Sequence, residues 1–356
     1  MEDKSMQRWL HWWNGSALDR PVMQICAPRS QIKTDASRYI ERARNPQAAW
    51  NDAENIFALN MAHLDNNLFL AEAAHVINPN WSAGTACFFG CEPMFTGSTV
   101  WVKPLEDAGD GYPPVSFDKD NKWLKFMLDF TGYCAKQDGF AEGRYHLVPH
   151  VGNSAADTLS LIRSDEKLMI DILENPGWVR QSVEKIAQAL YYVSDKIMDI
   201  IGYGNKSYSS WWGCVADKPV ATADADISCM LSPGQFEDFF LEQIAAQLGR
   251  APYSQYHLDG AGALAHLDAL LGLPQLNAIQ WVPGAGREAV MQWVPVIKKI
   301  QRAKKGVLAY AAPKEVPGLL DEIKSPEGLC ISTWCASEGE AYELLDFVEK
   351  QYGSKF

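Results

Sequence analysis

Short strand-like and helix-like segments alternate along the chain after residue 118, and this alternation constrains the fold more than any other feature. Each strand segment is followed, after a brief link, by a run with apolar residues at helical spacing. Strands are expected at residues 20–28, 144–150, 207–214, 253–260, 278–282, 306–311 and 328–334. Because an intervening helix returns the chain to the same end of the sheet, neighbouring strands of such repeats run parallel.

The number of repeats favours a closed barrel over an open sheet. At least six strand–helix units follow residue 118, and residues 20–28 add an earlier strand. No G-x-G-x-x-G follows a strand segment, so the pattern of a dinucleotide-binding sheet is missing. We therefore predict an α/β protein with a single (β/α)8 TIM-barrel domain over residues 1–356, a fold whose active-site residues lie at the C-terminal ends of strands.

Three segments precede or fall outside this alternation. Residues 1–20 carry three tryptophans at helical spacing, which predicts an amphipathic N-terminal helix packed on the main body. Residues 36–70 are expected to be mostly helical, with a break at Pro46. Residues 78–115 are rich in glycine, proline and aromatic residues, so we expect an irregular insert or a lid there.

Composition narrows the class of function. The formal net charge of −12, without a cluster of Lys and Arg, is unfavourable for binding a phosphate backbone, so no nucleic-acid partner is expected. The chain has neither an apolar run long enough to span a membrane nor a signal-peptide pattern at its start. Its eight cysteines do not have the spacing of a disulfide framework. We expect a reduced, cytoplasmic protein that acts on a small molecule and has no membrane partner.

Residues 253–260 form the most informative strand segment. Alternate side chains of a strand point to one face, so His257 and Asp259 share a face just before the glycine turn at Gly260. An imidazole and a carboxylate at the C-terminal end of a strand can bind a metal ion or share a proton. A structural hydrogen bond that closes the strand end is the alternative interpretation.

Other strand ends carry aromatic and polar candidates for a substrate pocket. The predicted substrate contacts are His150, Trp211, Trp212, Trp281 and Trp334 at or near strand ends, and Asp226 in the loop before the helix expected after Ser232. The tryptophans could wall an apolar pocket for a flat macrocycle, or surround a methylated ammonium through cation–π attraction. Taken one at a time, each tryptophan is better explained as a core aromatic, and it is their number at or near strand ends that favours a pocket.

Four stretches of the chain match a known pattern in order and spacing. They are residues 175–179 (Asn-Pro-Gly-Trp-Val), 231–237 (Leu-Ser-Pro-Gly-Gln-Phe-Glu), 257–260 (His-Leu-Asp-Gly) and 334–335 (Trp-Cys). With them the chain resembles the uroporphyrinogen decarboxylase superfamily, which also contains the zinc-dependent cobamide methyltransferases. The resemblance covers roughly residues 80–350 and itself implies a (β/α)8 barrel.

The methyltransferase branch of that superfamily binds zinc through H-x-C and a later cysteine. The corresponding residues here are His257, Asp259 and Cys335, so a carboxylate replaces one thiolate. The resemblance implies zinc at these three residues, with His257 and Asp259 catalytic. It also implies methyl transfer between a small methylated compound or thiol and a corrinoid cofactor carried by a partner protein.

Two alternatives stay open. The decarboxylase branch has an arginine-rich segment after its first strand, whereas residues 23–29 contain one arginine, Arg29, which counts against a porphyrinogen decarboxylase. The second alternative is a non-catalytic partner of a corrinoid protein, in which the pocket is kept and the chemistry lost. The carboxylate at Asp259 keeps this alternative open.

Overall fold

The computed structural model describes residues 3–37, 39, 46–77, 79–97, 99–109, 111–148 and 153–353, and it confirms an α/β fold built on a largely parallel sheet. Seven strands form this sheet in the order β2, β1, β13, β12, β11, β10 and β9. They are β1 (Val22–Pro28), β2 (Asn67–Ala71), β9 (Val220–Ala223), β10 (Tyr253–Asp259), β11 (Ala278–Val282), β12 (Gly306–Tyr310) and β13 (Leu329–Trp334). All neighbours pair in parallel except β2, which runs antiparallel to β1.

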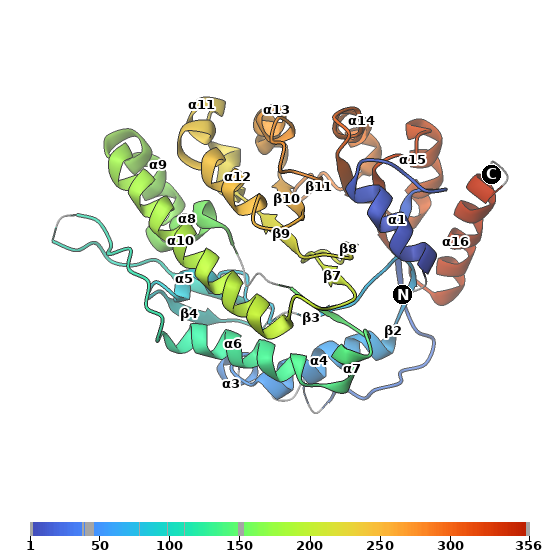
Figure 1. Ribbon diagram of the computed structural model, residues 1–356, viewed down its shortest axis with the longest axis horizontal. Helices are drawn as coiled ribbons and strands as arrows, with labels where there is room; N and C mark the ends of the chain where they lie inside the picture. Colours follow the sequence, from blue (N-terminus) through green and yellow to red (C-terminus); the bar gives the residue numbers. More distant parts are fainter. Residues whose placement is uncertain are drawn as a thin grey trace.

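Helices form an arc around the outer side of the strands (Figure 1). The C-terminal ones are α10 (Pro176–Ile201), α11 (Pro233–Phe236), α12 (Glu242–Leu248), α13 (Leu267–Leu271), α14 (Val294–Arg302), α15 (Val316–Ile323) and α16 (Glu338–Gly353). Those before α10 are α1 (Asp3–Trp13), α3 (Pro46–Trp50), α4 (Ala53–Asn66), α5 (Gly84–Cys87), α6 (Lys122–Ala135), α7 (Asp138–Ala141), α8 (Ala155–Arg163) and α9 (Asp165–Glu174). None of the described helices combines the length and the apolar character needed to cross a bilayer.

Three further strand pairs lie outside the seven-stranded sheet. Strand β3 (Val76–Ile77) pairs in parallel with β6 (His146–Leu147), while β4 (Glu92–Phe95) with β5 (Val100–Lys103) and β7 (Tyr208–Ser209) with β8 (Val215–Ala216) are antiparallel. Among the described residues, backbone hydrogen bonds do not join these pairs to β2 or β9. The closed barrel therefore stays a prediction, whereas the parallel sheet is observed.

The N-terminal half differs from expectation in its details. Residues 67–70 leave the helical region expected at 36–70 because they pair with β1 as part of strand β2, and residues 38 and 40–45 of that region lie outside the described residues. The insert at residues 78–115 is only partly irregular, since it contains α5 and the β4–β5 hairpin. The strand expected at 207–214 contracts to the two-residue strand β7, and the described part of the one expected at 144–150, residues 144–148, contains only the two-residue strand β6.

Helix α1 covers the amino end of the sheet, as its tryptophans predict. Trp9, Trp12 and Trp13 are buried in one cluster with residues at the starts of β1, β9 and β11. The indole Nε1 of Trp12 donates to the Val307 carbonyl (3.3 Å), and that of Trp13 donates to a carbonyl of β8 (2.8 Å). At Gly306 a Cβ would lie 2.9 Å from the Trp12 ring, so the absence of a side chain there lets α1 approach the sheet.

A buried carboxylate ties α1 to β1 and β2. Glu72, only 1% exposed, accepts hydrogen bonds from Arg20 Nη1 (2.7 Å) and Arg8 Nη1 (3.0 Å). It also accepts one from the backbone N–H of Met23 (3.0 Å). Because each partner is a charged group or a strand amide, the carboxylate holds three elements in a fixed relation.

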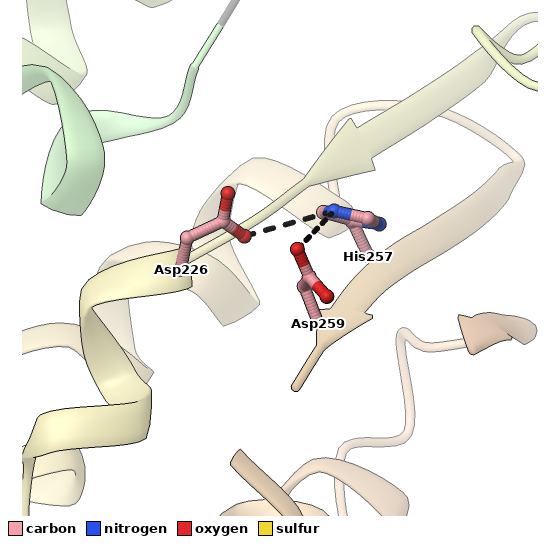
Figure 2. A group of neighbouring side chains, drawn as sticks. All are labelled: Asp226, His257 and Asp259. Carbon is pink, nitrogen blue, oxygen red and sulfur yellow. Dashed lines mark ion pairs between the residues drawn. The ribbon is translucent and has the colours of Figure 1, made fainter. Parts of the chain in front are cut away.

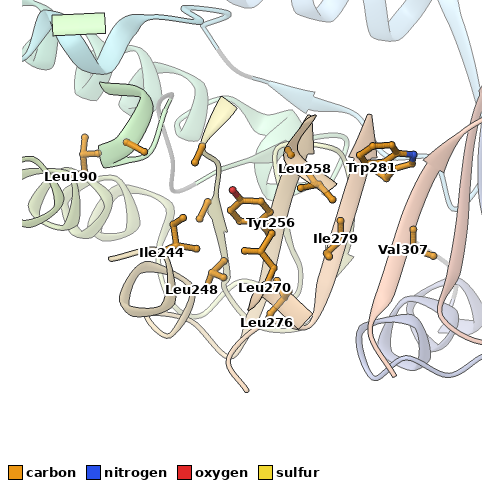
Figure 3. Packing of buried hydrophobic residues seen from close by; sticks show 14 of the residues in the cluster. Leu190, Ile244, Leu248, Tyr256, Leu258, Leu270, Leu276, Ile279, Trp281 and Val307 are labelled. Atoms are coloured by element: carbon orange, nitrogen blue, oxygen red, sulfur yellow. The ribbon is translucent and has the colours of Figure 1, made fainter. Parts of the chain in front are cut away.

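The two faces of the sheet differ in chemistry. The helix-facing side carries the main apolar core, shown in close-up in Figure 3. Its members include Tyr256, Leu258, Ile279, Trp281 and Val307. Alternation along β10 and β11 then turns Gln255, His257, Asp259 and Gln280 to the opposite, inner face. Polar groups are thus concentrated on the inner face, toward the carboxyl ends of the strands.

Candidate functional site

Three side chains converge where β10 ends. His257 Nε2 lies 3.6 Å from Asp226 Oδ1 and 4.0 Å from Asp259 Oδ2 (Figure 2). One ligand atom from each residue lies within 4.8 Å of the other two. His257 and Asp259 come from the inner face of β10, as their spacing predicts, and Asp226 opens the 3-10 turn Asp226–Met230 that follows β9. We call these residues the triad.

The backbone at Asp226 is held by the carboxylate of Asp157, a residue outside the triad. Asp157 of α8 is buried, and it accepts hydrogen bonds from the N–H groups of Asp226 (2.7 Å) and Ile227 (3.0 Å). These amides begin a 3-10 turn, where the first N–H groups have no partner within the turn. Asp157 therefore fixes the place at which Asp226 enters the site.

The ring of His257 is oriented from two sides. The Gln280 amide Nε2 donates to the Tyr310 hydroxyl (3.1 Å), so its carbonyl Oε1 faces His257 and accepts from Nδ1. With the proton on Nδ1, the lone pair of Nε2 points to the carboxylates. The Trp212 indole stacks on the same ring at 5.4 Å between centroids and 20° between planes. The proton on Nδ1 thus leaves Nε2 unprotonated, as binding of a metal through Nε2 requires.

Crowded carboxylates shift the proton affinities of the site. The Asp226 side chain is half exposed, yet partial burial of its carboxylate, followed by the nearby charge of Asp224, raises its pKa to about 6, against a smaller opposing effect of His257. Burial also raises the pKa of Asp157 well above its usual range, with Asp224 and Asp226 adding to the effect. Such accumulation of negative charge in a partly buried place favours the binding of a cation.

A cavity of about 170 Å³ opens beside the triad. It is lined by Ser82, Asn153, Trp211, Trp212, Thr222, Ala223, Asp224, Asp226 and His257. Three predicted substrate contacts, Trp211, Trp212 and Asp226, therefore lie around one cavity with the predicted catalytic histidine.

Other predicted site residues lie elsewhere. Trp281 is on the helix-facing side of β11, packed edge-on against Trp293 at 5.3 Å between ring centroids. Trp334 is half exposed at the end of β13 and stacks on His63 at 5.9 Å. His150 lies outside the described residues.

Cys335 does not belong to the triad. It follows β13, which is separated from β10 by two strands of the sheet. The alternation of β13 turns Trp334 inward, and Cys335 is buried in the helix-facing core with Ile331. Burial raises the pKa of its thiol to about 11, with Glu340 contributing. The structure thus groups two of the three residues implied by the resemblance and adds Asp226.

Several residues of the site have no clear signal in the sequence. Asp157 and Asn153 precede Asp226 by about seventy residues, and their contacts depend on how α8 meets the turn after β9. Gln280 could have been found, because alternation places it on the inner face of the strand next to β10.

The single arginine of the first strand region is already engaged. Arg29 Nε donates to the Asp65 carbonyl (3.1 Å), and its Nη1 lies 3.9 Å from Glu338. These contacts hold its guanidinium away from the role of a free carboxylate-binding group.

Comparison with known proteins supports the fold of this chain. Neither the known protein families nor the curated proteins include a match to this sequence. Among solved structures, the chain is similar to a methyltransferase from Methanosarcina mazei, with a TM-score of 0.64 and 12% sequence identity. The similarity covers 98% of this chain and 99% of that one, so the two share their fold over the full length.

Proposed function

We propose that this chain is a methyltransferase that uses a metal ion bound by Asp226, His257 and Asp259. The observation that carries the proposal is the convergence of one imidazole nitrogen and two carboxylate oxygens at the carboxyl end of β10. Its position agrees with the place of active sites in barrel enzymes. The full-length similarity to a structure described as a methyltransferase supports the same class of reaction.

The donor set fits zinc. Catalytic zinc sites use three protein ligands drawn from His, carboxylate and Cys, and they leave a fourth position for the reacting group. His257 would present Nε2, since Gln280 holds the proton on Nδ1, and the carboxylates of Asp226 and Asp259 would neutralise the charge of the ion. When bound, zinc would supply a Lewis acid that lowers the pKa of a thiol or hydroxyl acceptor.

We further propose that a corrinoid on a partner protein carries the methyl group, and that the strands complete a (β/α)8 barrel in a cytoplasmic enzyme. Tyr310 and Trp334, at the ends of β12 and β13, are 41% and 50% exposed. Such exposed aromatic surface, at the same carboxyl edge of the sheet as the triad, would suit contact with a flat macrocycle. The decarboxylase alternative loses support, because Arg29 is occupied by other partners.

Metal analysis of the purified protein tests the proposal. We expect about one zinc per chain in the native protein, and loss of zinc in Asp226→Asn and His257→Ala. Cys335→Ala should keep its zinc, as should Asp129→Asn, a control that removes an exposed carboxylate on α6. Loss of zinc in Cys335→Ala together with retention in Asp226→Asn would show that the ligand set implied by the resemblance is correct and the triad is not.

Activity is tested with the metal-loaded protein and a methylated cobamide. Transfer of the methyl group changes the visible spectrum of the cobamide, so the reaction can be followed directly with small thiols and alcohols as acceptors. His257→Ala should abolish the reaction, and Asp129→Asn should leave it unchanged.

A further inference from the structure

We propose that the cavity beside the triad is a binding subsite for a protonated amine. The inference rests on the proposed function, because it takes the bound molecule to be the substrate of methyl transfer. It adds that this substrate carries an ammonium group besides the atom that reacts. The substrate would then be a small cation, such as an aminothiol or an amino alcohol, and not an anionic thiol.

The first observation is a pair of buried oxygen atoms, a hydroxyl and an amide carbonyl, that have no hydrogen-bond partner among the described residues. Thr222 is 6% exposed, and its Oγ1 has no hydrogen-bond partner among the described residues. The buried Oδ1 of Asn153 is likewise unpaired there, and both residues line the cavity. A buried acceptor without a donor costs about 1–3 kcal/mol, which a ligand with N–H groups would recover.

The second observation is the charge of the wall. Asp224 and Asp226 both line the cavity, and no Lys or Arg does so in the described part of the chain. A divalent ion on the triad would be neutralised by the carboxylates of Asp226 and Asp259. Asp224 would then remain as an uncompensated negative charge facing the cavity, held in place by the N–H of Ser154 (2.6 Å).

The third observation is the aromatic side of the same cavity, formed by Trp211 and Trp212. Indole faces attract ammonium groups, and the attraction grows when the cation is partly removed from water. The Trp212 ring also stacks on His257, so this wall joins the subsite to the triad. A ligand could therefore reach the metal with one end and the carboxylate with the other.

The size of the cavity limits the ligand. About 170 Å³ greatly exceeds the roughly 10–15 Å³ that one water requires, yet it holds only a small organic molecule. Acceptors that need N–H donors favour a primary or secondary ammonium over a quaternary one. These features together specify a short chain with a protonated amine.

Three thiols with the same two-carbon chain test this specificity in the zinc-loaded protein. They are 2-aminoethanethiol, 2-mercaptoethanol and 2-mercaptoethanesulfonate, whose far ends are cationic, neutral and anionic. By calorimetry near neutral pH, we expect the aminothiol to bind roughly tenfold more tightly than the neutral thiol, and the sulfonate to bind most weakly. Equal or tighter binding of the sulfonate would overturn the inference.

Two variants locate the effect. Asp224→Asn should reduce the preference for the cationic thiol to near unity, with zinc content unchanged. Thr222→Val should weaken the aminothiol several-fold and 2-mercaptoethanol less, because an ammonium offers three donors and a hydroxyl one. The variant should unfold at an equal or higher temperature, because the substitution removes an unpaired buried hydroxyl. An unchanged preference in both variants would contradict the assignment, whereas Asp129→Asn should match the native protein.

A metal-free experiment separates this inference from the proposed function. Propylammonium and 1-propanol, which carry no thiol, are compared with chelator-treated protein. Preferential binding of propylammonium that depends on Asp224 supports the subsite even if the native protein contains no zinc. A zinc-containing protein that does not distinguish the two compounds, nor the three thiols, would refute the subsite and leave the metal site intact.

Discussion

Replacing Gln280 with leucine tests whether the orientation of His257 prepares the metal site. Gln280 is 2% exposed, and its Oε1 accepts the Nδ1 proton that leaves Nε2 free to bind a metal. Leucine has a similar size but no acceptor, so the ring would lose the contact that sets its tautomer. Removal of such a partner typically weakens metal binding 10–100-fold, or about 1.4–2.7 kcal/mol.

The assay is a competition titration of zinc against a chromophoric chelator, which gives the dissociation constant of each variant. Gln255→Leu is the matched control, because Gln255 is also buried on the inner face, two residues before His257 on β10. Its amide donates to Cys214 Sγ (3.4 Å), and among the described hydrogen bonds the ring of His257 bonds to Gln280 and not to Gln255. We expect its zinc affinity to equal that of the native protein.

A rescue variant sharpens the test. Gln280→Glu keeps an acceptor for Nδ1 and should bind zinc at least as tightly as the native protein, since a carboxylate raises the basicity of the ring. Two results would contradict this role of Gln280. One is a zinc affinity of Gln280→Leu within twofold of the native value, and the other is an equal loss of zinc affinity in Gln255→Leu.

Two further predictions concern stability. Glu72→Gln should destabilise the protein by about 3–5 kcal/mol in urea unfolding, because it leaves buried guanidinium charge without its partner. Glu322→Gln, which breaks an exposed ion pair, should have almost no effect, and equal losses would show that burial is not the cause. In metal-free protein, the raised pKa of Asp226, from 3.8 to about 6, means that its contribution to stability is present below about pH 4 and is lost as pH rises through 6. Asp226→Asn should therefore make stability fall less over this pH range, and an unchanged pH profile would contradict the shift.

The sequence was sufficient to predict the parts of the site that depend on strand periodicity. His257 and Asp259 share the inner face because they are two residues apart on β10, and no tertiary information is needed for that. The same rule places Trp281 on the other face from Gln280, so its role in the core was predictable. The resemblance suggested Cys335 as a metal ligand. The alternation of β13 turns its neighbour Trp334 to the inner face, so Cys335 lies in the helix-facing core.

The contribution of Asp226 could not be predicted with the same certainty. Its direction depends on a 3-10 turn whose amides are held by Asp157, a residue of a helix that the sequence pattern did not reveal. Strand β9 escaped notice for a related reason, since four residues are too few to show a period. Contacts between turns far apart in the chain depend on packing and leave no local pattern.

The cover that α1 forms over the sheet has a consequence for synthesis of the protein. The bond from Trp12 to Val307 spans 295 residues, and that from Trp13 to Val215 spans 202. The three tryptophans therefore leave the ribosome long before the strands that bury them have been synthesised. Contacts between residues so far apart in the sequence form late and slowly during folding. Until then this segment offers apolar surface to chaperones, and its fluorescence would report when the last strands reach their places.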